Sequence, residues 1–448
     1  MPPRRSARLL AAAEERVSSV LPPLPPALAL AILALLPLKA RARAACVSRA
    51  WRSAADASEA WTTLDLRPYS SLGAEKYSAL LRGAAAKARG RLVSLDVRGN
   101  QGGLRAALRS VVAANGGSLR ELWLGLHWNS NELTVLLTSA PALRALHAGV
   151  LAEPDAAAAL LSEPRFRVRQ LCIDFSRHRT PPPLAALAAL LRHCATLKRL
   201  RLHRFSVGDA APLRELLDAA AAARLPALDL AFCRLPNDAP DALAALLRGG
   251  TLARLYVTGP DEPLLRDAHA AAPLCDALRG CATITTLRFV AVRLFLNVDA
   301  GLALLAAITG HASIRRLRLW SNPFEDGDGA DAISGALAAL VAANAPSLTD
   351  LDLDNTVRSD RAAAPLLRAL RANTHLRGLG LIRNDFSAAF INDELLDALR
   401  ENASLERLRL DRSKAEQRAA EDFVAHRAAA RRRGDAAPIE ERETDDEW

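Results

Sequence analysis

The sequence predicts an α/β solenoid, in which parallel strands form the inner side of a horseshoe and helices its outer side, preceded by a small all-helical domain. Three observations predict it. A short leucine pattern recurs through most of the chain, Ala- and Leu-rich segments separate its copies, and an apolar segment bounded by prolines precedes the first copy. The composition agrees: 50% of the residues are hydrophobic but only 4% are aromatic, which suits thin stacked layers better than one large core.

Composition and charge limit the classes of function. The length of 448 residues suggests more than one domain. The chain carries 59 Lys and Arg against 49 Asp and Glu, a net charge of +10. Nearly all the basic residues are Arg, and a chain-wide preference of this kind can follow from genome composition. The positions of the arginines therefore matter more than their number, and the net charge alone does not indicate a nucleic-acid partner.

The cysteines predict neither a metal site nor a disulfide framework. None of the six belongs to a Cys-x-x-Cys pair, and no His-x-x-x-His pattern accompanies them, although zinc sites typically use such spacings. We therefore expect no metal and no cofactor, and reduced thiols in a cytoplasmic and/or nuclear protein. The six are Cys46, Cys172, Cys194, Cys233, Cys275 and Cys281.

One uncharged segment, 21–38, could be mistaken for a membrane span or a signal peptide. Five prolines interrupt it, and its unbroken apolar part, 27–36, has ten residues, which is too short to cross a bilayer. A signal peptide would follow a short basic start, whereas Glu14 and Glu15 precede this segment. We expect neither membrane association nor secretion.

The beginning of the chain predicts a small helical domain over 21–60, after a flexible basic arm over 1–20. Prolines bound the first helix: Pro25 and Pro26 suit its first turn, and Pro37 ends it. A second, short helix is expected to follow and to carry Cys46, Val47 and Trp51. The apolar residues that share one face of the first helix are Leu28, Ile32 and Leu35 or Leu36.

This segment resembles the F-box. The pattern is a Leu-Pro start, an Ile and a Leu four residues apart, a Val eleven residues on and a Trp four later, with an exit motif at 61–66. The chain departs from it at Ala27, where an acidic residue is usual, and at Arg41, where the second helix usually begins with an apolar residue. The residues to which the resemblance assigns an adaptor-binding role are Leu24, Pro25, Leu28, Ile32, Leu36, Val47 and Trp51.

From residue 61 to residue 413 the chain is periodic. The template Leu-x-x-Leu-x-Leu recurs thirteen times at an average step of about 29 residues, at the long end of the range for leucine-rich repeats. A single copy means little, but thirteen at near-constant spacing resemble a leucine-rich-repeat solenoid, in which the leucines of each short strand point inward. The central leucines are Leu64, Leu95, Leu122, Leu146, Leu171, Leu200, Leu228, Leu255, Leu287, Leu317, Leu351, Leu379 and Leu408.

Two further features of the repeats predict a scaffold. Ala- and Leu-rich helices between the strands, such as 241–248 and 333–343, resemble the ribonuclease-inhibitor-like subclass, and this resemblance implies the strongly curved horseshoe. Asn or Cys often stands five residues after the central leucine, where it can satisfy the backbone groups of a buried turn. These residues are Asn100, Cys233, Asn322 and Asn384.

The end of the chain changes in composition. Residues 414–433 predict a polar helix, which is expected to cap the last repeat, since the open edge of a solenoid exposes apolar surface. Residues 434–448 are dominated by Asp and Glu, a composition typical of a disordered tail.

The outward positions of the strands predict the binding surface. Arg with interspersed Trp and Tyr is typical of protein-binding surfaces, and Arg forks suit carboxylate or phosphate groups. The residues predicted to bind a target are Arg199, Arg201, Arg254, Tyr256, Arg288, Arg316, Arg318 and Trp320. The outward residues that follow them are Asp350, Asp352, Asp354, Gly378, Gly380, Arg407, Arg409 and Asp411.

No constellation of catalytic residues emerges, because His and Cys are dispersed. The two runs that contain several glycines, 99–103 and 325–329, do not end in the Lys-Ser/Thr of a phosphate loop. The F-box resemblance implies a non-catalytic, substrate-recognition subunit of a ubiquitin ligase. Its partners would be a Skp adaptor, a cullin scaffold and an acidic or phosphorylated target protein. Two alternatives stay open. One is a free-standing repeat scaffold whose helical start only caps the repeats. The other is a nucleic-acid binder, against which the low aromatic content and the acidic residues Asp350, Asp352 and Asp354 argue.

Overall fold

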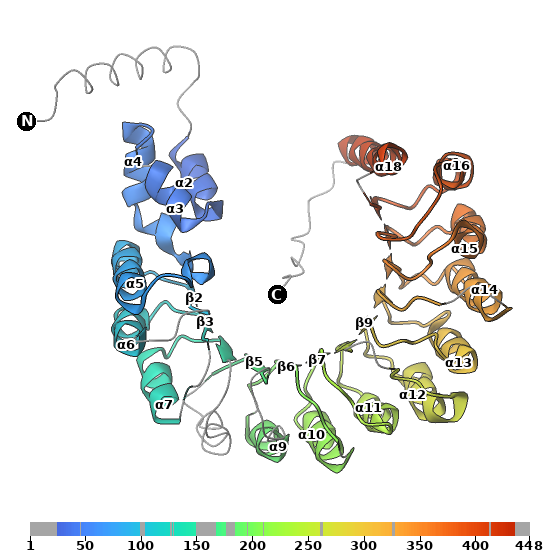
Figure 1. Cartoon of the computed structure of the whole chain (residues 1–448), viewed down its shortest axis with the longest axis horizontal. Helices are drawn as coiled ribbons and strands as arrows, with labels where there is room; N and C mark the ends of the chain where they lie inside the picture. The colour runs from blue at the N-terminus through green and yellow to red at the C-terminus, as the bar shows by residue number, and fades with distance from the viewer. Residues whose placement is uncertain are drawn as a thin grey trace, which may run out of the picture. The chain divides into compact units, whose positions relative to one another are not determined.

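The computed structural model (Figure 1) divides into two compact units, which are described in turn. The first contains Met1–His178 and His193–Lys198, and the second contains Arg179–Arg192 and Arg199–Trp448. The residues that the structure describes are 25–44, 46–98, 104–125, 128, 130–148, 167–175, 184–194, 196–208, 210–259, 263–324, 328–411 and 414–434.

The first unit begins with a helical domain. It contains α2 (Pro26–Leu35), α3 (Leu38–Ala44), α4 (Arg49–Asp56) and the 3-10 turn η1 (Ser58–Trp61). As predicted, prolines bound α2: Pro25 is its N-cap, and the helix ends before Leu36. The prediction of one second helix was wrong. Cys46 and Val47 lie in a turn between α3 and α4, because Ser48 adopts an extended backbone and caps α4, its hydroxyl accepting from the backbone N–H of Trp51 at 3.3 Å.

The repeats of the first unit follow directly. The strands are β1 (Thr63–Asp65), β2 (Ser94–Asp96), β3 (Glu121–Trp123), β4 (Ala145–Ala148) and β5 (Gln170–Asp174). Each strand pairs with the next in parallel. The helices between them are α5 (Ala74–Ala88), α6 (Leu104–Asn115) and α7 (Ser130–Ser139), and η2 (Arg67–Tyr69) follows β1. Neighbouring helices α5, α6 and α7 pack side by side.

The second unit repeats the same arrangement, with its strands along the inner side of an arc of helices (Figure 1). The strands are β6 (Arg199–His203), β7 (Ala227–Ala231), β8 (Arg254–Thr258), β9 (Thr286–Val290), β10 (Arg316–Arg318), β11 (Asp350–Asp352), β12 (Gly378–Gly380) and β13 (Arg407–Arg409). The helices are α9 (Leu184–His193), α10 (Ala210–Ala222), α11 (Ala239–Arg248), α12 (Ala268–Gly280), α13 (Val298–Ile308), α14 (Asp328–Ala342), α15 (Asp360–Ala372), α16 (Ala388–Phe390), the π-helical turn η3 (Ile391–Leu395), α17 (Leu396–Glu401) and α18 (Ala415–Gly434).

The predicted fold class is confirmed in both units. Each of the thirteen predicted central leucines lies in a different strand, and successive leucines stand in register, as Leu317 does between Leu287 and Leu351. All of them are at least nine-tenths buried, between the sheet and the helices. Because every repeat supplies the same leucine at the same register, the core continues from one repeat to the next.

Buried Asn and Cys side chains satisfy the turns, as predicted. The Asn322 amide nitrogen donates to the backbone oxygens of Phe289 and Leu319 at 2.8 and 2.9 Å, while its oxygen accepts from the N–H of Val292 at 3.1 Å. The Asn384 oxygen accepts a similar bond, and the Cys233 thiol lies 3.4 Å from a backbone oxygen of the preceding repeat. Asn100 lies outside the described residues.

Helix α18 covers the last strand. The Glu421 carboxylate accepts a hydrogen bond from the backbone N–H of Leu410 at 2.6 Å, just after β13. Arg427 donates to the backbone oxygen of Leu405 at 3.0 Å. Ala420 and Val424 are fully buried. The helix therefore supplies polar partners and apolar contact at an edge where no further repeat follows in the described chain.

Among the described helices, none combines the length and the apolar composition that crossing a membrane requires. The described residues also contain no group of three or more His, Cys, Asp or Glu side chains placed to hold a metal ion.

Candidate protein-interaction site

The helical domain presents large apolar side chains to solvent. Leu28 is 50% exposed, Leu35 is 87% exposed, and Val47 in the α3–α4 turn is 63% exposed. Leu28 and Leu35 are seven residues apart and therefore share one face of α2. The opposite face carries Ala29 and Leu33, which are buried. Helix α2 is thus apolar on both sides, although only one side is covered within the described chain.

The predicted adaptor-contact residues divide between surface and interior. Leu28, Val47 and Pro25 are exposed, as a contact role requires. The side chains of intermediate exposure are those of Ile32, Leu36 and Trp51. Leu24 lies outside the described residues. Helical spacing allows either Leu35 or Leu36 to complete the face of Leu28 and Ile32, and in the structure Leu35 is the more exposed of the two.

Arg41 has a structural role that the sequence did not predict. It is 6% exposed and ties three parts of the helical domain together. Its guanidinium donates to the backbone oxygens of Leu36 at 2.7 Å, Ala60 at 2.8 Å and Thr63 at 2.8 Å. Burial lowers the pKa of Arg41 from its usual value. At this position the F-box pattern has an apolar residue that packs in the core. Here the Arg41 side chain joins the same parts of the domain by hydrogen bonds.

The helical domain is joined to the first repeat by polar contacts as well as by the chain. Within the helical domain, the Trp61 indole N–H donates to the backbone oxygen of Ala55 at 2.6 Å and so positions the ring. From the first repeat, the Lys87 ammonium of α5 lies 4.9 Å from the centre of that ring. Lys87 also lies 3.4 Å from the Asp56 carboxylate. These contacts fix the orientation of the helical domain against α5.

In the second unit, the predicted target-binding arginines of β6 surround a buried carboxylate. Asp229 on β7 is 4% exposed. Its oxygen lies 3.1 Å from Nε of Arg201 and 3.9 Å from Nη2 of Arg199. Burial raises the pKa of the Asp229 carboxyl, and the two arginines oppose this rise. Asp229 therefore orients both arginines along the face of the sheet.

The neighbouring strands add aromatic surface. The Tyr256 ring on β8 has the Arg288 guanidinium at 4.8 Å and the Arg199 guanidinium at 5.8 Å from its centre. Arg254 on the same strand is exposed. The β6–β9 face, defined here as Arg199, Arg201, Asp229, Arg254, Tyr256 and Arg288, thus carries four arginines against one aspartate.

The three remaining predicted target-binding residues have a different environment. Arg316 and Arg318 on β10 stand in register with Asp350 and Asp352 on β11. Trp320, just after β10, is 41% exposed. The adjacent carboxylates reduce the positive potential here, so the excess of positive charge is greater on the β6–β9 face.

The sheet of the first unit carries a second mixed surface. The Arg98 guanidinium lies 4.1 Å from the centre of the Trp123 ring, which stacks on the His147 ring with an interplanar angle of 3°. Arg98 also pairs with Asp96 at 2.7 Å. Trp123 and His147 are both more than nine-tenths buried. This stack offers little open surface to a partner.

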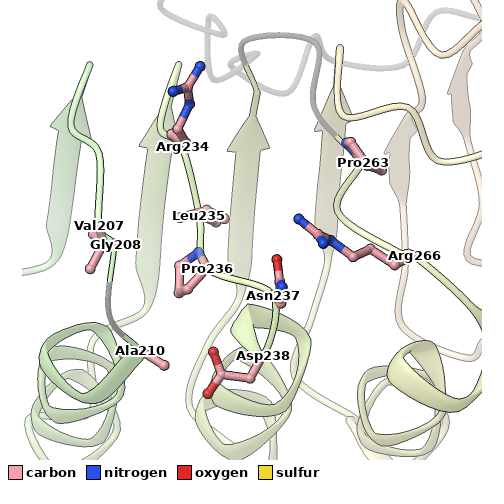
Figure 2. Close-up of a pocket in the computed structure, with 10 residues that line it drawn as sticks. All are labelled: Val207, Gly208, Ala210, Arg234, Leu235, Pro236, Asn237, Asp238, Pro263 and Arg266. Carbon is pink, nitrogen blue, oxygen red and sulfur yellow. The ribbon is translucent and has the colours of Figure 1, made fainter.

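A hollow of about 730 Å³ lies between the loops that lead from β6, β7 and β8 into the following helices (Figure 2). Leu235 and Pro236 form part of its wall, and Arg266 extends toward it (Figure 2). Asp238 at the start of α11 also lines it and lies 3.7 Å from Arg214. No sequence pattern predicts this hollow, because its lining comes from three loops without a shared motif.

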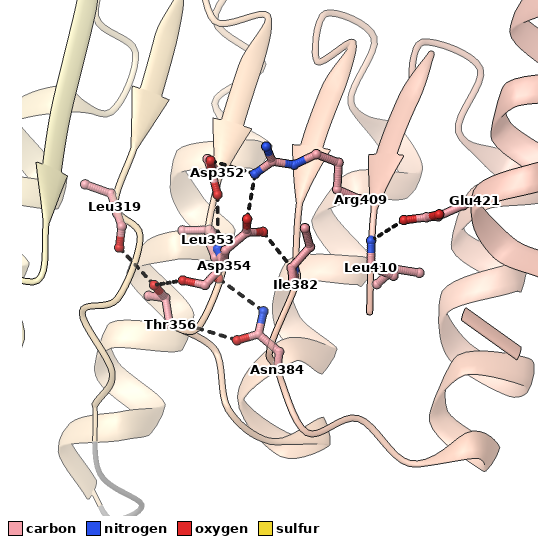
Figure 3. A network of polar contacts seen from close by, with 10 residues as sticks. All are labelled: Leu319, Asp352, Leu353, Asp354, Thr356, Ile382, Asn384, Arg409, Leu410 and Glu421. Carbon is pink, nitrogen blue, oxygen red and sulfur yellow. Dashed lines mark hydrogen bonds and ion pairs between the residues drawn. The ribbon is translucent and has the colours of Figure 1, made fainter. Parts of the chain in front are cut away.

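The last three strands form an ion-pair network, the glycine-strand network, defined as Asp350, Asp352, Asp354, Arg407 and Arg409. Arg409 on β13 donates to Asp352 at 2.8 Å and to Asp354 at 2.6 Å (Figure 3). Arg407 pairs in the same way with Asp350. Strand β12 lies between the two sets of charges, and its outward residues are Gly378 and Gly380.

Comparison with known proteins gives a family for the helical domain. Residues 21–67 match the model of the F-box-like family. No curated protein matches the chain. The solved structures that it is similar to include the Rad7–Elc1 complex of yeast, with 14% identity and a TM-score of 0.41 over 80% of this chain and 88% of that chain. Another is the leucine-rich-repeat protein LegL7 of Legionella pneumophila, with 17% identity and a TM-score of 0.38 over 76% of this chain and 88% of that chain.

A repeat solenoid joined to a small helical domain with exposed apolar residues defines a class of protein that acts through protein–protein contacts. The family match over 21–67 shows that the chain contains an F-box-like domain, and the repeating strands and helices that follow it form a leucine-rich-repeat solenoid.

Proposed function

We propose that this protein is the substrate-recognition subunit of a Skp–cullin–F-box ubiquitin ligase. F-box domains in general bind an adaptor of the Skp type. In this role the helical domain holds the adaptor, the adaptor holds the cullin scaffold, and the repeats hold the target. The chain itself performs no chemistry, because a separate enzyme transfers ubiquitin and proximity supplies the rate enhancement.

The exposed apolar face of α2 carries this proposal. Leu28 and Leu35 on that face, and Val47 in the α3–α4 turn, are all at least half exposed. Burying one such side chain contributes about 1.5–3 kcal/mol, so leaving three of them in water favours a partner that covers them. The contacts of η1 with α5 hold this domain in one orientation, which suits a receptor that must present its target to an enzyme.

The test is co-purification of the tagged full chain from cells. The wild type is expected to bring down both a Skp adaptor and a cullin. The double variant Leu28→Glu with Leu35→Glu is expected to bring down neither. The control is Val135→Glu with Leu296→Glu, because these residues are also exposed and apolar but lie on the repeats. If the wild type brings down no adaptor, the chain is a free-standing repeat scaffold and its helical domain is a cap.

For the target, we propose an acidic or phosphorylated segment that binds the β6–β9 face, with Arg316, Arg318 and Trp320 at its border. Asp229 holds Arg199 and Arg201 in place, so part of the entropy cost of ordering the arginines is met within the fold. The Tyr256 ring adds apolar area between Arg199 and Arg288. An anionic segment along this face would contact arginines from three strands.

This part of the proposal is tested on the partner that proximity labelling of the wild type identifies. Arg254→Ala with Arg288→Ala is expected to weaken its binding by about tenfold or more, since charge-assisted contacts to arginine contribute roughly 1.5–3 kcal/mol. The control, Arg361→Ala with Arg400→Ala, removes the same charge from exposed positions on the helices. Equal binding by the two double variants would move the target site away from the β6–β9 face.

A further inference from the structure

The glycine-strand network joins charges that an ordinary strand would keep apart. Asp350 and Asp352 lie on β11, and Arg407 and Arg409 lie two strands away on β13. Strands in a sheet are about 4.8 Å apart, so each arginine must extend across the whole width of β12. Side chains on β12 would normally occupy that space.

The two glycines of β12 make this crossing possible. A Cβ on Gly378 would lie 2.5 Å from an Asp350 oxygen and 3.1 Å from Nη2 of Arg407. A Cβ on Gly380 would lie 2.8 Å from an Asp352 oxygen and 2.9 Å from Nη2 of Arg409. Neither glycine has the positive φ that would otherwise call for glycine. Space for the ion pairs is therefore the reason that the structure shows for glycine at both positions.

The carboxylates and the guanidiniums of the network differ in exposure. The Asp352 and Asp354 side chains are 12% and 8% exposed, whereas the Arg407 and Arg409 side chains are each 47% exposed. The aspartates are fixed in the sheet, and Asp354 also accepts from the Ile382 N–H at 2.7 Å. The arginines lie on top of the network with half of their surface in water, where an external anion can reach them.

We propose that Arg407 and Arg409 form a binding site for an acidic peptide segment, and that Asp350, Asp352 and Asp354 occupy this site from within the chain and hold it closed. The aspartates take the places that ligand carboxylates would take. A ligand can form ion pairs with Arg407 and Arg409 only when the pairs between these arginines and the aspartates are weakened. The site is separate from the β6–β9 face, and its test does not depend on whether a target binds there.

Protonation of Asp354 is one way to weaken the internal pairs. Its carboxyl is buried and lies beside Asp352, and these two causes raise its pKa to about 6 although Arg409 opposes the rise. On the neighbouring strands, Arg318 of β10 stands in register with Asp352, and Asp411 lies two residues after Arg409 of β13. The outward residues of β12 are glycines and carry no charge. At pH 5.5 most molecules would carry a neutral Asp354, and Arg409 would keep only Asp352.

The first experiment measures the affinity of the full chain for a fluorescent octaglutamate peptide at pH 7.5. Asp352→Asn with Asp354→Asn keeps the size and one oxygen acceptor of each side chain but removes its charge. This variant is expected to bind about tenfold more tightly than the wild type, as two charge-assisted contacts become available. Adding Arg407→Gln and Arg409→Gln to it is expected to abolish the gain.

A matched variant separates a local effect from one of net charge. It combines Asp352→Asn and Asp354→Asn with Arg361→Gln and Arg400→Gln, so its net charge equals that of the quadruple variant above while Arg407 and Arg409 stay. It is expected to keep the tenfold gain. An unchanged affinity on loss of the aspartates, or a gain that disappears in this charge-matched variant, would overturn the proposal.

A second measurement needs no change at the aspartates. The wild type is expected to bind the same peptide more tightly at pH 5.5 than at pH 7.5, and Arg407→Gln with Arg409→Gln is expected to reduce that increase. The difference between the two proteins is the quantity to compare, because it isolates the contribution of Arg407 and Arg409. An equal pH dependence in both would contradict the proposal.

Discussion

The guanidinium of Arg41, which is buried in the helical domain, donates a hydrogen bond to the backbone oxygen of Ala60 at 2.8 Å. We predict that Arg41→Met destabilises this domain by roughly 3 kcal/mol, because three backbone oxygens lose a donor and each unsatisfied buried group costs about 1–3 kcal/mol. Hydrogen–deuterium exchange over residues 26–66 of the full chain would measure it. Arg43→Met, at an exposed position of the same helix, should leave exchange unchanged. Equal exchange in the two variants would show that Arg41 is not structural.

Asn322 should be a stability determinant of the second unit. It is fully buried and exchanges five hydrogen bonds with the backbone of two repeats. We predict that Asn322→Ala lowers the free energy of unfolding by about 3 kcal/mol, since the turn keeps several buried groups without partners. Urea unfolding followed by circular dichroism would measure the loss. The exposed Asn392 provides the control, because Asn392→Ala should change stability by less than about 0.5 kcal/mol.

Gly380→Ala should disrupt the glycine-strand network. The added Cβ would come within 2.8 Å of both Asp352 and Asp354, so the carboxylates or β12 must move, at a cost of about 1–3 kcal/mol. Gly335→Ala in α14 is the matched control, since nothing lies within 4 Å of a Cβ there. In a helix this change should stabilise by roughly 0.5–1 kcal/mol. Thermal unfolding of the two variants should therefore shift in opposite directions, and a shift in the same direction would contradict the role given to Gly380.

Asp354 should make stability depend on pH. Its pKa is raised from the usual value of about 4 to about 6, so the folded chain binds this proton more tightly than the unfolded chain. The stability that it contributes is present below about pH 4 and is lost as the pH rises through about 6. Relative to Asp354→Asn, the wild type should lose free energy of unfolding between pH 4.5 and pH 7. If the free energy of unfolding changed with pH in the same way in both proteins over this range, the Asp354 carboxyl would not have the raised pKa assigned to it.

Much of the fold follows from the sequence, because the repeat signal is carried by buried leucines. Each strand needs one leucine at its centre. Because the pattern occurs thirteen times, a wrongly assigned copy would not change the predicted fold. The same holds for Asn322 and Asn384, whose position in the template predicts their contact with the turn. Prolines marked both ends of α2, since Pro26 fits only a first helical turn and Pro37 cannot continue the helix.

The candidate sites were less predictable, because they depend on which side chains meet across strands. The sequence identified Asp352 and Arg409 as outward residues, but they are 57 residues apart and only the pairing of β11, β12 and β13 brings them together. Asp229 was missed beside Arg201 for the same reason. Arg41 departs from the F-box pattern, and its role is not predictable from the sequence, because a buried arginine replaces an apolar residue only where backbone oxygens surround it.

The central claim is tested most directly by titrating the purified full chain with a purified Skp-type adaptor in a calorimeter. The account predicts saturable binding at one adaptor per chain, weakened by about tenfold or more in Leu28→Glu with Leu35→Glu, since both changes place a charge in the apolar contact. Val135→Glu with Leu296→Glu should bind as the wild type does. Absence of binding by the wild type, or undiminished binding by the Leu28→Glu with Leu35→Glu variant, would contradict the account.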